Sequence, residues 1–124
     1  MTEVLEHLSD EELELTLVEV RRVLKPNGRF LGTVPADENL ELNKVVCPFC
    51  GKVFHRWGHM QSFSKERLYK LLAGKFSRVS ISRHYFFYWR ELNWKGKASA
   101  LLKLGLLKVG VAGSDTTFFF QAYK

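Results

Sequence analysis

The alternation of helical and extended patterns is the feature that most limits how this chain can fold. Residues 9–12 have the S-x-x-E form of a capping box, and apolar residues then recur at helical spacing over 13–24. The Lys-Pro-Asn-Gly stretch at 25–28 ends that helix, because proline cannot continue its hydrogen bonds and Asn-Gly favours a tight turn. An apolar strand is predicted next, over 29–34.

Two further helix-to-strand changes are predicted after residue 61. The pattern indicates a helix over 65–73 and a strand over 77–89, then a partly helical segment over 93–109 and a closing strand over 116–123. This order predicts a single α/β domain, residues 1–124. We expect three layers, with a largely parallel sheet and an antiparallel final strand.

Aromatic residues are concentrated in two runs, 85–89 and 118–120. We expect both runs to lie inside the sheet, and a stacking platform for single-stranded nucleic acid is the less favoured alternative. Periodicity is lost over 35–61, which is therefore expected to be an insertion in the domain.

The charge of the chain is unevenly distributed. Its 124 residues carry a formal net charge of +6, but residues 1–51 hold five Lys and Arg against ten Asp and Glu, and the remainder holds fourteen against three. The basic half predicts either contact with an anionic partner or a solvated surface. The start of the chain is acidic rather than cationic and apolar, and no apolar run reaches about 18 residues, so we expect a cytoplasmic protein without a membrane span.

The two cysteines of the chain lie close to two of its four histidines. Cys47, Cys50, His55 and His59 offer two thiolates and two imidazoles, the ligand set that Zn²⁺ prefers in closed structural sites. Structural zinc is therefore predicted inside the insertion. A redox C-x-x-C pair and two unrelated thiols remain as alternatives.

Two motifs give the chain a resemblance to a known family. The run Glu-Val-Leu-Glu-His-Leu at 3–8 and the run Arg-Val-Leu-Lys-Pro-Asn-Gly-Arg-Phe-Leu at 22–31, with an acidic helix between them, resemble class I S-adenosylmethionine-dependent methyltransferases. In that family such runs end the fourth strand and lead into the fifth. Relatives also carry Cys/His insertions at this position, often with the His-Arg-Trp-Gly-His run found here at 55–59.

The resemblance implies the C-terminal half of a Rossmann-like methyltransferase sheet. The glycine-rich cofactor loop of the family would precede Glu3, so S-adenosylmethionine would bind only if the N-terminal half were supplied, for instance on another chain. Within that half, His7 is the candidate catalytic base and Glu3 and Glu6 are candidate cofactor contacts. The alternative is that Glu6 and His7 only begin the loop before the helix.

The remaining candidate residues are those expected to bind a methyl acceptor or a partner protein. Arg56 and Trp57 lie between the two histidines of the insertion, where we expect them to contact an acceptor or a partner, or Trp57 to form the apolar centre of the loop. The basic apolar segment 94–109 is expected to be core or a substrate lid rather than a membrane-surface helix.

Two functions follow from these features. The first is the C-terminal part of a methyltransferase, inactive by itself, which pairs with the missing half or self-associates. The alternative is a zinc-stabilised interaction module that binds a partner protein or, less favoured, nucleic acid.

Overall fold

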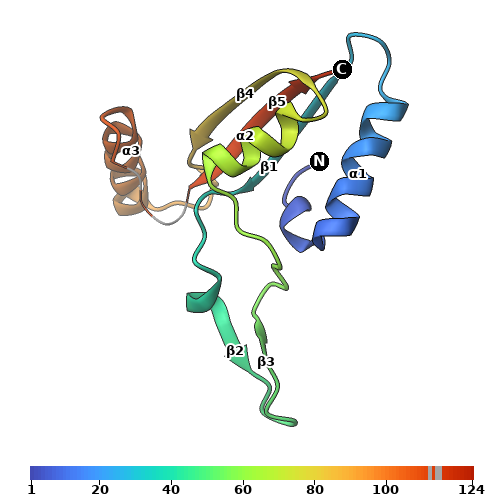
Figure 1. Cartoon of the computed structure of the whole chain (residues 1–124). Coiled ribbons are helices and arrows are strands. Elements are labelled where there is room, and N and C mark those ends of the chain that lie inside the picture. Colours follow the sequence, from blue (N-terminus) through green and yellow to red (C-terminus); the bar gives the residue numbers. More distant parts are fainter. Residues whose placement is uncertain (112, 114–115) are drawn as a thin grey trace.

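The computed structural model describes residues 1–111, 113 and 116–124 (Figure 1). In chain order, the described elements are η1 (Leu5–His7), α1 (Asp10–Val23), β1 (Arg29–Pro35), η2 (Leu40–Asn43), β2 (Lys44–Val46), β3 (Val53–His55), α2 (Lys65–Ala73), β4 (Ser77–His84), α3 (Trp94–Lys108) and β5 (Thr117–Tyr123).

The main sheet has the order β1-β5-β4, and the expected largely parallel sheet is wrong. Strand β5 lies between the other two and pairs antiparallel with both, from Arg29↔Tyr123 to Pro35↔Thr117 on one side and from Ser77↔Tyr123 to His84↔Thr117 on the other. Strands β1 and β4 therefore run in the same direction, but the last strand separates them. No ladder between named strands is parallel in the described part of the chain.

The described elements form two layers instead of the expected three. Alternate residues of β1 and β5, including Phe30 and Phe120, face a core that also contains leucines from both α1 and α2. Two ion pairs link α1 to α2 and to the residues just after it, Arg67 with Asp10 and Lys75 with Glu14. Both helices therefore cover one face of the sheet, and burial of this shared apolar face stabilises the fold.

The capping box at the start of α1 is confirmed. The Ser9 side chain accepts a hydrogen bond from the backbone N–H of Glu12, and the Glu12 carboxylate accepts one from the backbone N–H of Ser9 at 2.9 Å. This second bond holds the pKa of Glu12 below its usual range. The predicted helix over 65–73 and the closing strand are confirmed as well.

The region before and within α3 differs from the sequence expectation. Strand β4 ends at His84, and the aromatic run at 85–89 lies outside the sheet with Phe86 and Tyr88 exposed. Helix α3 forms, but of its residues only Ala100 is buried, and it lies apart from the main sheet (Figure 1). The expectation that this helix is core is therefore wrong, and the alternative expectation of a substrate lid stays a prediction.

The insertion forms a two-stranded antiparallel hairpin, β2 and β3, that projects away from the sheet and helices (Figure 1). Its ladder runs from Lys44↔His55 to Val46↔Val53. The hairpin returns to the body of the molecule through residues 56–63, where Ala36 and Phe63 form an isolated bridge. Phe63 is fully buried and anchors this return in the core.

The N-terminal residues are held against the free edge of β1. The backbone N–H of Thr33 donates to the carbonyl of Met1 at 3.1 Å, and the N–H of Glu3 donates to the carbonyl of Thr33 at 3.0 Å. Gly32 makes this approach possible, because a Cβ there would collide with the Met1 carbonyl and with the Phe120 ring. The segment that leads into η1 is thus positioned by β1.

We predict that Gly32→Ala destabilises the fold by about 1–3 kcal/mol through overpacking. Gly105→Ala is the matched control, since a Cβ at that exposed position of α3 meets nothing within 4 Å. The control should leave stability unchanged or raise it by up to about 1 kcal/mol, because alanine is the better helix former. Urea denaturation measures both variants, and equal stability of Gly32→Ala and the wild type would contradict the close approach.

Candidate metal centre

Glu6 lies in the short helix η1 between the N-terminal segment and α1. The backbone carbonyl of Glu6 accepts hydrogen bonds from the N–H groups of Met60 at 2.7 Å and Gln61 at 3.0 Å. The Gln61 side chain in turn donates to the carbonyl of Leu8 and to the carboxylate of Asp10. These bonds join the segment before α1 to the end of the insertion.

The carboxylate of Glu6 is buried without a bonding partner. The residue is 1% exposed, and neither carboxylate oxygen has a hydrogen-bond partner among the described residues. Burial raises the pKa of this carboxyl, and the nearby Glu3 adds to the rise, while its own backbone N–H, His59 and His7 oppose it. A buried carboxylate of this kind is costly unless a cation or a proton neutralises it.

Two histidines lie beside Glu6. The Nδ1 atom of His7 is 3.3 Å from the carbonyl oxygen of Gly58, and the Nδ1 atom of His59 is 2.5 Å from Oε2 of Glu38. Both partners are acceptors, so each Nδ1 carries a proton that it donates. In a neutral imidazole the Nε2 atom then keeps its lone pair, and Nε2 of both histidines is available to a metal.

Glu6, His7 and His59 form a group that could hold a metal ion. One ligand atom from each residue lies within 4.8 Å of the others. The rings of His7 and His59 meet edge to face, with their centroids 4.8 Å apart. Hydrogen-bond acceptors that face Nδ1, as found here, are typical of metal-bound histidines, because they fix the tautomer and orient the ring.

A second group of the same kind shares His59 and is only partly satisfied by hydrogen bonding. Its members are Glu38, His55 and His59. The Nδ1 atom of His55 accepts a bond from the backbone N–H of His59 at 3.1 Å, so the proton of the neutral ring is on Nε2, which lies 3.4 Å from Oε1 of Glu38. The Glu38 carboxylate is bonded by Nδ1 of His59 and by the Asn43 side chain, whereas Nε2 of His55 is buried without a hydrogen bond among the described residues.

The four residues of the predicted zinc site lie in two separate places. Cys47 and Cys50 form the turn at the tip of the hairpin, whereas His55 ends β3 and His59 lies beyond it. Neither of the metal-binding groups found in the described part of the chain contains a cysteine. The structure thus pairs the cysteines with each other and the histidines with carboxylates, and the four-ligand zinc site stays a prediction.

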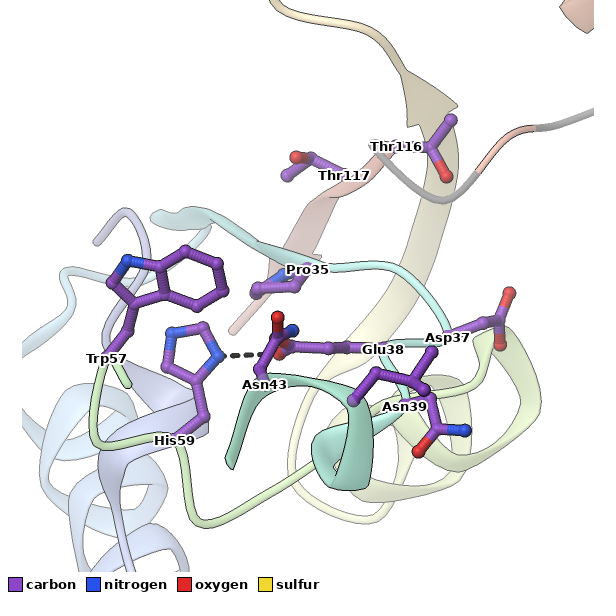
Figure 2. A pocket seen from close by; sticks show the side chains of 10 residues that line it. Pro35, Asp37, Glu38, Asn39, Asn43, Trp57, His59, Thr116 and Thr117 are labelled. Atoms are coloured by element: carbon purple, nitrogen blue, oxygen red, sulfur yellow. Dashed lines mark hydrogen bonds and ion pairs between the residues drawn. The ribbon is translucent and has the colours of Figure 1, made fainter. Parts of the chain in front are cut away.

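A cavity of about 560 Å³ lies next to His59, between the end of β1, the start of β5 and η2 (Figure 2). Figure 2 shows the Trp57 ring beside His59, with Glu38 and Asn43 across from it. The rest of the wall combines polar residues such as Asn39 and Thr116 with the apolar Pro35 and Leu42. The cavity therefore offers a small molecule both hydrogen-bonding groups and apolar surface.

Trp57, but not Arg56, lines this cavity. The Arg56 guanidinium lies 5.9 Å from the centroid of the Trp57 ring, and Trp57 is about half exposed. Glu3 is exposed at a backbone φ of 50°. The acceptor role of Arg56 and Trp57, the cofactor role of Glu3 and Glu6 and the catalytic role of His7 stay predictions.

Comparisons with known proteins do not assign a family. The sequence matched no family model and no curated protein. None of the helices in the described part of the chain is both long and apolar enough to cross a membrane.

Glu38 is the functional residue that sequence reasoning missed. It lies in an irregular stretch between β1 and η2, with no spacing that relates it to the histidines. Its carboxylate accepts from His59 and also from the Asn43 side chain at 2.9 Å. Only the return of the insertion to the body of the molecule brings these residues together, so no local signal could have found it.

We predict that Glu6→Gln stabilises the metal-free protein at pH 7. Because the pKa of Glu6 is raised in the folded chain, ionisation costs more there than in the unfolded chain, whose carboxyl has its ordinary value near 4.5. This cost is absent well below pH 4.5, where the Glu6 carboxyl is protonated in both the folded and the unfolded chain. It grows as the pH rises above 4.5. The ionisable groups that face the carboxylate are Glu3, His7 and His59.

Urea midpoints in the presence of a chelator measure this effect. The variant should unfold at higher urea than the wild type at pH 7, and the difference should shrink toward zero at about pH 4. An equal difference at both pH values, or a less stable variant at pH 7, would contradict the cost of burying Glu6.

Proposed function

We propose that this chain is the acceptor-binding C-terminal part of an S-adenosylmethionine-dependent methyltransferase, and that Glu6, His7 and His59 hold a divalent metal ion in it. The single observation that carries the proposal is the buried Glu6 carboxylate, which has no hydrogen-bond partner among the described residues. It lies beside two histidines whose Nδ1 atoms each face a hydrogen-bond acceptor. A cation neutralises that carboxylate and takes up both free Nε2 lone pairs.

The donor set favours a transition metal, and zinc is our choice. Two imidazoles and one carboxylate suit Zn²⁺, Mn²⁺ or Fe²⁺ better than Ca²⁺, which prefers oxygen ligands only. Three protein ligands leave at least one position open, unlike a closed structural site. A bound metal in such a site acts as a Lewis acid that lowers the pKa of a coordinated hydroxyl group.

The residues around the centre are suited to hold and orient an acceptor. Glu38 keeps the proton on Nδ1 of His59, which fixes the tautomer and the plane of the ring. Trp57 offers a flat apolar surface at the adjoining cavity, and the amides of Asn39 and Asn43 offer hydrogen bonds there. We infer that the acceptor is a small molecule with a hydroxyl group on a flat ring.

The resemblance to methyltransferases supports the reaction type. Residues 3–8, which resemble the end of the family's fourth strand, lie in the structure against residues 58–61 of the insertion. S-adenosylmethionine supplies the methyl group, and we propose that it binds when the N-terminal half joins this chain. Two free thiols fit a reducing, cytoplasmic location.

We predict that zinc affinity depends on Glu6, His59 and Glu38 to different degrees. In a Cys47→Ser, Cys50→Ser background, Glu6→Gln or His59→Gln should weaken zinc binding on the order of 100-fold or more. Glu38→Gln should weaken it by about 10- to 100-fold, since it acts through His59. Isothermal titration calorimetry measures the affinities, with Glu11→Gln as an exposed control on α1.

The Glu6→Gln variant distinguishes metal binding from a folding defect. It should be more stable than the wild type without metal and less able to bind zinc, two changes that a misfolded protein cannot show together. Zinc binding that is unchanged in Glu6→Gln would overturn the proposed centre.

Methyl transfer is tested with the chain co-expressed with a polypeptide that carries a glycine-rich cofactor loop. We expect formation of S-adenosylhomocysteine with phenolic hydroxyl acceptors, its loss on chelation, and its loss in His59→Gln with cofactor binding unchanged. Full activity of His59→Gln in the presence of chelator would contradict the metal's role. If zinc still binds but no methyl transfer occurs, the proposed metal centre stands and the proposed methyltransferase reaction is overturned.

A non-catalytic interaction module is the second candidate, because helix α3 exposes Trp94, Leu101 and Leu102 together with three lysines, Lys95, Lys97 and Lys108. Tight binding of nucleic acid that weakens steeply with salt would favour this candidate over the enzyme.

A further inference from the structure

The turn at the tip of the hairpin brings two thiols together. The N–H of Cys47 donates to the carbonyl of Lys52 at 2.8 Å, and the N–H of Gly51 donates to the carbonyl of Cys47 at 3.0 Å. Gly51 has a φ of 70°, a left-handed conformation that glycine adopts without strain. The turn therefore closes tightly over the Cys-Pro-Phe-Cys sequence, and both cysteines are free thiols.

Both cysteines are accessible to a metal ion. Cys50 is exposed, and Cys47 is intermediate in burial. Zinc binds the thiolate form of cysteine. The pair thus offers two sulfur ligands at one point.

Among the described residues, no third or fourth metal ligand accompanies the two cysteines at the tip. The nearest histidine in the sequence, His55, lies at the other end of the ladder opposite Lys44, and the metal-binding groups of the described residues contain no cysteine. Figure 1 shows the tip far from the sheet and from both termini. A tetrahedral zinc site needs four ligands, so one chain supplies half of the set.

The surface around the thiols fits a second copy of the same tip. Phe49 is 97% exposed, and Val46 and Val53 on either side of the turn are also exposed. Such apolar side chains favour burial against similar ones. Lys52, adjacent to the turn, supplies a positive charge from each copy, which balances the double negative charge of a zinc ion with four thiolates.

We propose that Cys47 and Cys50 bind one Zn²⁺ together with the same two cysteines of a second copy of this chain. The contact is isologous, with a two-fold axis through the metal. Zinc replaces the protons of the thiols, which pass to the buffer. Residues of the Glu6 centre take no part, so this site is independent of the proposed methyltransferase function.

Native mass spectrometry with Zn²⁺ and a reductant tests the proposal in a His7→Gln background, which removes a ligand of the other centre. We expect a dimer with one zinc ion per two chains, conversion to monomer by a chelator, and a zinc-free monomer for Cys50→Ser. Lys44→Ala, an exposed change on the same hairpin outside the turn, should still form the dimer.

One zinc ion bound per monomer would overturn the proposal and support the predicted four-ligand site with His55 and His59. A zinc-dependent dimer that persists in Cys50→Ser would overturn it as well.

Titration with Co²⁺ gives a second readout, because thiolate ligands produce charge-transfer absorption in the near ultraviolet. That absorption should reach its maximum at half an equivalent of Co²⁺, and a maximum at one full equivalent would contradict the shared site.

Discussion

The buried carboxylate of Glu6 is the group that the surrounding structure is least able to stabilise by itself. Its backbone carbonyl is bonded twice, yet its two carboxylate oxygens have no partner among the described residues. Buried polar groups in folded proteins are almost always paired, so an unpaired one indicates a missing ion, proton or ligand. The neighbouring histidines, each with its Nδ1 proton donated elsewhere, make a metal ion the simplest partner.

The sheet and the insertion both serve to position this group. Strand β1 holds the N-terminal segment along its edge, where Gly32 leaves room, and η1 follows directly. The hairpin leaves the body after β1 and returns through residues 56–63, which places Gly58 and His59 against η1. Two segments about fifty residues apart thus meet at one site, and the core anchor Phe63 fixes the second of them.

Sequence patterns predicted the local elements well and the neighbours of each element poorly. The capping box, the Pro-Asn-Gly turn and helix α2 depend on nearby residues, which periodicity and turn chemistry can read. The order of strands depends on where β5 inserts, and alternation of helix and strand carries no information on that. In the same way the histidines were recognised by type, but their carboxylate neighbours depend on long-range contacts. Glu38 and His59 are 21 positions apart, and Glu6 and His59 are 53 positions apart.

Anomalous X-ray diffraction at the zinc absorption edge, on crystals grown with zinc, is the most direct test of the metal centre. We expect an anomalous peak within bonding distance of the Glu6 carboxylate and of Nε2 in both His7 and His59. A Glu6 carboxylate without metal, alongside zinc bound by His55, His59 and the two cysteines of the same chain, would contradict the proposed centre.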